Sequence, residues 1–234
     1  MKIHHITPTI IIILIIFVTF WFCIGDIGKS TEIEKITAPI QIISNQEKII
    51  NGVSIRSNVY TIDNITKVVL VKSGATLEIS PVMELKSETA ASKTTVSGSI
   101  VTFTPTTETS VKMYPLVESK DVPDGGYEVE VTYNSKPATN ILKFKLKLDG
   151  LEYYYQPPLN EEPWAVKGCT ATSCRNATRP ENVVGSYAFY HVGGGKAFHL
   201  YRPLITDAKG NKTWGSLNIT GSVLALTVDQ KWLN

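Results

Sequence analysis

Apolar and polar residues alternate with a period of two along much of the chain. The pattern is clearest in residues 127–133 (YEVEVTY) and 142–148 (LKFKLKL). Because successive side chains of a strand point to opposite faces, each stretch predicts a strand with one buried and one solvated face. We expect the two to pair as a hairpin with Val131 opposite Phe144, which sets the glutamates of one strand opposite the lysines of the other.

Turn signals separate further short stretches of this kind. Asn51-Gly52 lies between apolar residues and predicts a tight hairpin. Residues 66–80 contain an apolar run, a Ser-Gly turn and a second alternating stretch. The Ser/Thr-rich residues 87–110 include Ile100, Phe103 and Val111, which favours exposed strands with polar outer faces over a flexible stalk.

No stretch shows a convincing amphipathic helix, and a sheet with one dry face needs a second layer. The sequence therefore predicts an all-β protein built as an antiparallel β-sandwich, of jelly-roll or immunoglobulin-like type. We expect a β-rich, Ser/Thr-rich region over residues 30–120 and a sandwich module over residues 121–234.

The N-terminal part of the chain has a different pattern. An unbroken apolar run covers residues 10–24, close to the length of a secretory signal and short of the roughly 20 residues of a membrane span. Cys23 and Gly25 are small residues at the spacing used for cleavage after Gly25. Residues 1–28 are therefore expected to be a signal peptide or a retained signal anchor, and the protein to be secreted or at the cell surface.

Two cysteines, Cys169 and Cys174, remain beyond this segment. A zinc site would need further cysteines or histidines at matching spacing. In an oxidising compartment we expect a short-loop disulfide, worth about 2 kcal/mol, with free thiols as the alternative. Four glycosylation sequons would suit a surface location, although chance explains them equally well in a Thr-rich chain: Asn64, Asn176, Asn211 and Asn218.

Residues 191–211 (HVGGGKAFHLYRPLITDAKGN) combine glycines, a lysine and two histidines. They lack the spacing of a phosphate-binding loop, and the acidic stretch lacks the ligand pattern of a calcium loop. Two β-turns joined by a strand explain the stretch. With Gly193–Gly195 as the first turn, His191 and His199 are expected on one side of the hairpin, roughly 7–8 Å apart, which is a thin metal site.

Aromatic residues are the remaining candidates for ligand binding. Tyr153 and Tyr155 are expected on one face of a strand and Tyr154 on the other; with Trp164 and Trp214, the first two could stack on sugar rings. The alternative is that one of these faces belongs to the core. The adjacent Glu161-Glu162 pair does not form an acid/base dyad, because adjacent side chains of an extended segment point apart. The sequence indicates no metal site and no cofactor.

The C-terminal half resembles a known group of modules. The stretches TNILKFKLKLDGLEYYYQ, GKAFHLYRPLITDAKGNKTW and LALTVDQKWLN are similar to β-rich modules of large exported proteins, including Rhs-like, cell-surface repeat and phage-like metagenomic proteins of unknown function. The resemblance covers residues 127–234 and implies a structural or connecting domain without agreed catalytic residues. Those modules continue into another strand, so we expect either a fragment of a longer reading frame or a module completed by a strand of another chain.

The sequence as a whole favours an exported, non-enzymatic structural or adhesive module. The alternatives are a carbohydrate-binding module and a fragment of a larger secreted hydrolase, which would need His191 or His199 close to Asp207 or Glu161. Expected partners are other surface proteins or copies of the same chain at an open sheet edge, and glycans. The net charge of +2 gives no case for nucleic acid, and membrane contact is expected only through residues 10–24.

Overall fold

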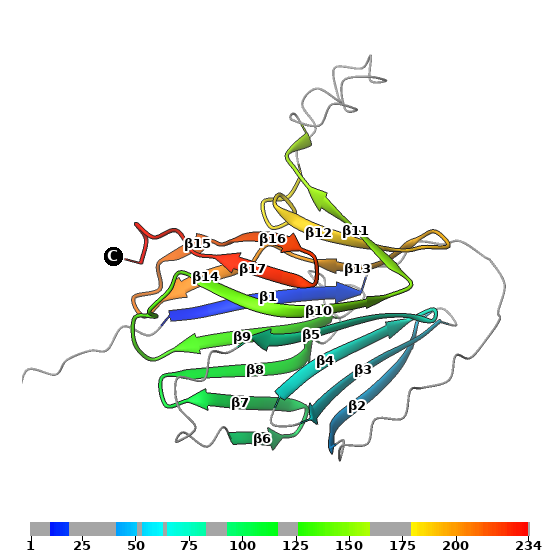
Figure 1. The fold of residues 1–234 in the computed structure, drawn as a ribbon, viewed down its shortest axis with the longest axis horizontal. Coiled ribbons are helices and arrows are strands. Elements are labelled where there is room, and N and C mark those ends of the chain that lie inside the picture. Colours follow the sequence, from blue (N-terminus) through cyan, green and yellow to red (C-terminus); the bar gives the residue numbers. More distant parts are fainter. Residues whose placement is uncertain are drawn as a thin grey trace, which may run out of the picture.

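The described residues of the chain form two antiparallel β-sheets and almost no helix (Figure 1), as the alternating patterns predict. A computed structural model describes residues 10–18, 41–50, 53–62, 65–82, 93–116, 126–159 and 179–233. Within this part of the chain, no helix is long and apolar enough to cross a membrane. The predicted all-β class is confirmed.

The larger sheet, sheet A, has ten strands among the described residues. Eight of them lie in the order β11 (Leu151–Gln156), β12 (Ser186–His191), β13 (Lys196–Leu200), β1 (Ile10–Val18), β9 (Gly126–Tyr133), β8 (Thr109–Leu116), β7 (Ile100–Thr106) and β6 (Lys93–Ser97). The remaining two are β14 (Leu204–Asp207), which pairs with β1, and β15 (Lys212–Trp214), which pairs with β14.

The smaller sheet, sheet B, has seven strands in the part of the chain that the structure describes. Their order is β16 (Ser216–Thr220), β17 (Val223–Thr227), β10 (Ile141–Asp149), β5 (Ala75–Val82), β4 (Ile65–Lys72), β3 (Val53–Ile62) and β2 (Gln41–Ile50).

Buried apolar side chains of both sheets form one core cluster. Phe189, Phe198 and Val129 come from sheet A, and Phe144 and Leu224 come from sheet B. In β10 the alternation is as predicted, with apolar side chains buried between exposed lysines. The dry faces of the two sheets therefore supply the core together.

The predicted hairpin of residues 127–133 and 142–148 is wrong. β9 pairs with β8 and β1 in sheet A, whereas β10 pairs with β5 and β17 in sheet B. The predicted glutamate–lysine pairs are wrong for the same reason: Glu130 binds Lys112 of β8 at 3.0 Å, and Lys147 lies 3.6 Å from Glu78 of β5. Alternation defines which face is buried but does not select the neighbouring strand.

Both predicted tight hairpins in the N-terminal half are confirmed. Ile50 pairs with Val53 across the turn, whose residues 51–52 lie outside the described part, and Lys72 pairs with Ala75 across Ser73-Gly74. The Ser/Thr-rich region contributes strands β6 to β8. β7 and β8 alternate between buried and partly exposed side chains, and the outward residues of β7 are mainly threonines, whereas β6 has no buried side chain.

The chain passes from sheet B to sheet A at Gly150. Asp149 still pairs with Thr76 of β5, while Leu151 already pairs with His191 of β12. Gly150 has a φ of +65°, a left-handed conformation that glycine adopts without the steric cost of a side chain. A strand that changes sheet through such a bend is typical of a corner between two packed sheets.

Residues 10–18 of the predicted export segment form β1. This strand lies between β9 on one side and β13 and β14 on the other, and Ile12 is buried in the core. The rest of the predicted segment, residues 1–9 and 19–28, lies outside the described residues. One copy of residues 10–18 cannot serve both as a removed leader and as this strand.

Candidate functional site

The three consecutive tyrosines lie on β11, the outermost strand of sheet A, where β12 is its one partner among the described strands. Tyr153 and Tyr155 share a face, as predicted, and are 36% and 50% exposed. Beside them, on the same face of the neighbouring strand β12, lie Phe189, with its ring centre 6.2 Å from that of Tyr153, and Tyr187, with its ring centre 5.4 Å from that of Tyr155. We call these four residues the aromatic shelf.

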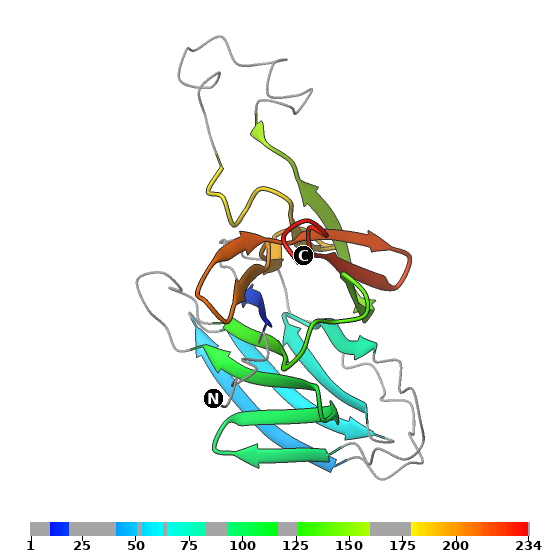
Figure 2. The same ribbon diagram turned by 90° about the vertical axis from the view of Figure 1, so that its left-hand side faces the viewer.

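The shelf rests on the core at one end. Tyr187 is buried, and its hydroxyl oxygen accepts a hydrogen bond from the backbone N–H of Ile219 at 3.2 Å. Ile219 belongs to β16, the outermost strand of sheet B. Figure 2 shows β11 continuing past the orange and red strands β16 and β17. The shelf is therefore the inner face of sheet A at the place where sheet B ends, which leaves its two outer rings accessible.

Arg202 lies at the rim of the shelf. A Cβ atom placed on Gly185 would lie 3.7 Å from the Tyr155 hydroxyl oxygen and 3.7 Å from Cδ of Arg202, so these two groups flank the glycine. Nε of Arg202 donates to the backbone oxygen of Gly215 at 3.0 Å, and its Cζ lies 5.8 Å from the ring centre of Trp214. Sequence reasoning did not identify Arg202, because no motif marks it.

Trp214 is half-buried and does not share a strand face with the two exposed tyrosines. It pairs with Leu204, one residue before the fully buried Ile205, so its side chain lies on the face of β15 opposite the core. Arg202 connects it to the shelf through the cation–π contact. Of the four predicted ligand residues, Tyr153 and Tyr155 are brought together, Trp214 lies around the rim, and Trp164 lies outside the described residues.

A second aromatic pair occupies the other face of β11. The rings of Tyr154 and Tyr190 meet edge to face, with their centres 5.6 Å apart. The Tyr154 hydroxyl donates to a carboxylate oxygen of Glu152 at 2.8 Å, which raises the pKa of that tyrosine. This face is aromatic and acidic, whereas the shelf borders an arginine.

The two histidines lie on opposite faces of the β12–β13 hairpin, so the prediction that they share a side is wrong. His199 pairs with Ala188 and lies on the face of Ser186, whereas His191 is an odd-numbered residue of β12 and lies on the face of Phe189. A bulge at Ala197 shifts the register by one residue. Nδ1 of His191 accepts a hydrogen bond from the backbone N–H of Gly193 at 2.9 Å.

His199 and Ser186 form a buried polar pair, with 2.7 Å between Nε2 and Oγ. Burial, followed by the charges of Lys196 and Arg179, lowers the pKa of His199 to about 3. Its Nδ1 has no hydrogen-bond partner among the described residues. A serine nucleophile needs an accessible Oγ and an oriented imidazole. This pair has the residue types of a catalytic dyad, but its Oγ is buried.

Asp207 belongs to a turn, as predicted for this stretch. One of its carboxylate oxygens accepts hydrogen bonds from the backbone N–H groups of Lys209 and Asn211, and the other accepts one from the Asn211 side chain. Gly210 in this turn has a φ of +86°. The carboxylate is thus occupied in stabilising its own turn.

A cluster of titratable groups lies on the outer face of sheet A. The Tyr114 hydroxyl donates to Glu128 at 2.6 Å and lies 3.5 Å from Glu130, which also binds Lys112. Burial, more than any other cause, raises the pKa values of both Tyr114 and Glu128. Tyr114 pairs with Glu128 and Lys112 with Glu130 across β8 and β9, so the cluster is explained as cross-strand pairing on a sheet face.

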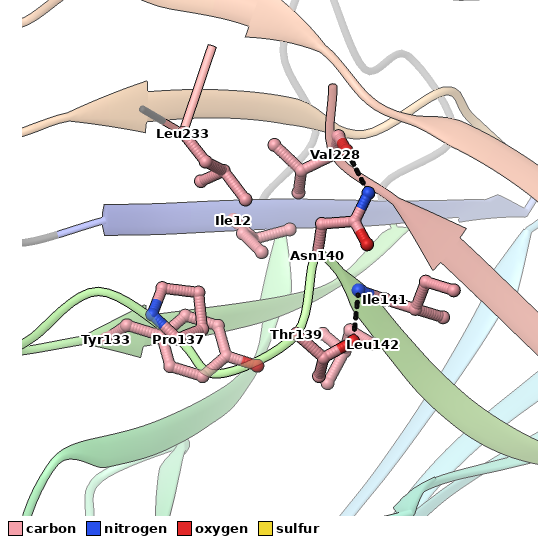
Figure 3. A pocket seen from close by; sticks show the side chains of 9 residues that line it. All are labelled: Ile12, Tyr133, Pro137, Thr139, Asn140, Ile141, Leu142, Val228 and Leu233. Carbon is pink, nitrogen blue, oxygen red and sulfur yellow. Dashed lines mark hydrogen bonds between the residues drawn. The ribbon is translucent and has the colours of Figure 1, made fainter. Parts of the chain in front are cut away.

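A small cavity lies elsewhere, near the start of β1 (Figure 3). Ile12, Leu142, Val228 and Leu233 supply much of its apolar wall, and the Asn140 side chain donates to the backbone oxygen of Val228 at 2.8 Å. It has room for about one water molecule. A gap of this size in the core holds no substrate.

Other predicted features fall outside the structure or find no support in it. Residues 160–178, which include Glu161 and the predicted disulfide of Cys169 and Cys174, lie outside the described residues. In the described part of the chain, no group of three or more metal-ligating side chains lies together. Comparisons with protein-family models, with curated proteins and with solved structures found no match.

Proposed function

We propose that this protein is a non-enzymatic adhesive module that binds carbohydrate through the aromatic shelf. The observation that carries the proposal is the pair of exposed tyrosine rings, Tyr153 and Tyr155, each flanked by the ring of its buried cross-strand partner, Phe189 or Tyr187. Solvent-exposed rings held by neighbouring rings are suited to the apolar face of a sugar ring, and tyrosine loses little conformational entropy on binding.

The strand fixes the spacing of the two rings. Residues i and i+2 of a strand lie about 7 Å apart, so an extended chain of two or more sugar units would span both tyrosines. Because β12 is the one partner of β11 among the described strands, such a chain would reach the shelf from the side without displacing any of them. Binding on a rigid strand also avoids the cost of ordering a loop.

Binding is favoured over catalysis by the distribution of chemical groups. The exposed side chains of the shelf are aromatic, whereas the Ser186–His199 pair is buried. The proposal places the protein outside the cell on the strength of the cysteine pattern of the sequence, and it counts residues 10–18 of the apolar run as strand β1. It also treats the two sheets as a β-sandwich that carries the shelf at one edge.

Glycan-array binding tests the proposal with a matched pair of variants. Tyr155→Ala removes a shelf ring, and Tyr154→Ala removes a ring of similar exposure from the opposite face of the same strand. We expect the wild type to bind a set of glycans, Tyr155→Ala to lose about tenfold or more in affinity, and Tyr154→Ala to bind as the wild type does. Equal losses in both variants, or no binding by the wild type, would refute the proposal.

A further inference from the structure

We infer that the shelf prefers an anionic glycan, with Arg202 as the residue that determines this preference. The inference rests on the proposed function and adds the chemical class of the ligand. Its basis is the position of Arg202 at the end of the tyrosine pair, next to Gly185 and Trp214.

Gly185 lies between Tyr155 and Arg202, where a Cβ atom would make ordinary contacts with both groups. Its φ of +80° favours glycine. The Tyr155 hydroxyl and the Arg202 side chain approach the same point from two sides. A sugar unit stacked on Tyr155 would therefore have its edge directed toward the arginine.

The guanidinium of Arg202 is held in place but keeps donors for a ligand. Nε donates to the Gly215 backbone oxygen, and the Trp214 ring lies beside Cζ. Its two terminal nitrogens have no hydrogen-bond partner among the residues that the structure describes. A carboxylate or sulfate matches such a pair of N–H donors better than a neutral hydroxyl does, because charged hydrogen bonds are about twice as strong.

The surrounding charges are divided between the two faces of β11. Arg179 donates to the backbone oxygen of Pro157, directly after the strand, and its charge acts on His199 of the opposite face, so it is not counted toward the shelf. Glu152 belongs to the opposite face, where it binds Tyr154. Glu181, exposed in the turn that precedes β12, is a nearby negative charge and would weaken the preference slightly.

Isothermal titration calorimetry tests the inference with oligosaccharide pairs that differ only at C6, such as oligogalacturonate and the matching galactose oligomer. The wild type is expected to bind the acidic member about tenfold more tightly, with an affinity that falls as salt is raised. Arg202→Gln is expected to abolish the difference between the two members. Arg202→Lys keeps the positive charge but lacks the planar set of N–H donors, and it is expected to retain part of the preference for the acidic member.

The controls separate this inference from the proposal on which it rests. Lys209→Gln removes one positive charge from an exposed turn and is expected to leave the preference unchanged. Equal binding of acidic and neutral members by the wild type, at all salt concentrations, would overturn the inference while leaving carbohydrate binding intact. Absence of binding to both members would overturn the two together. The salt dependence of the wild type decides the question even if Arg202→Gln does not fold.

Discussion

His199 illustrates how burial decides the role of a residue that sequence alone leaves open. The side chain is 2% exposed and shares a hydrogen bond with Ser186. Sequence reasoning placed it on the hairpin but could not foresee the bulge at Ala197, which changes its face. The faces on which the three tyrosines of β11 lie were predicted correctly, because alternation along a single strand can be predicted without knowing which strands lie beside it.

The lowered pKa of His199 predicts an acid-sensitive contribution to stability. The unfolded chain takes up a proton below the ordinary pKa of 6.5, whereas the native state does so only near pH 3. The free energy of unfolding therefore falls as pH drops between these values. His199→Gln removes this titration, so the variant should lose about 2–3 kcal/mol less than the wild type between pH 7 and pH 4.5. Identical losses in denaturant titrations at the two pH values would contradict this prediction.

For the strands, the sequence predicted where a strand occurs and which of its faces is buried better than it predicted which strands pair. The hairpins at residues 50–53 and 72–75 were predictable because a two-residue turn leaves one possible partner. The strands of residues 127–133 and 142–148 are joined by a longer connection, which allows the chain to cross to the other sheet. Arg202 was missed because its neighbours come from three separate segments of the chain, around Tyr155, Gly185 and Trp214.

The corner at Gly150 can be tested by substitution. A Cβ atom there would meet only ordinary contacts with Ala75, so the cost arises from the positive φ and not from a clash. Gly150→Ala should lower the free energy of unfolding by about 1 kcal/mol, and Gly150→Asn by less, since asparagine tolerates this conformation. Chemical denaturation measures both. A Gly150→Ala variant as stable as the wild type would show that the corner does not need glycine.

For the whole molecule, β1 holds the two halves of sheet A together. Among the described strands it is the one that pairs with β9 on one side and with β13 and β14 on the other. No local pattern in the sequence could reveal this, because its partners lie more than 100 residues away. The same apolar run is also typical of an export signal.

Truncation of a single side chain tests the importance of this strand. Ile12 is 2% exposed and contributes to the core. Ile12→Ala should lower the free energy of unfolding by about 2–5 kcal/mol, the usual cost of a cavity in a packed core. Val192→Ala, at a turn position that is 63% exposed, should change it by less than about 0.5 kcal/mol. If both variants unfold at the same denaturant concentration, β1 does not belong to the core.

The most direct measurement of the central claim is an NMR titration of the protein, carrying ¹³C-labelled tyrosine rings, with an acidic oligosaccharide. Tyr153 and Tyr155 should shift progressively and saturate together, while Tyr154 and Tyr190, on the opposite face of the sheet edge, should remain in place. Shifts confined to Tyr154 and Tyr190, or no saturable shift in any tyrosine ring, would contradict the account.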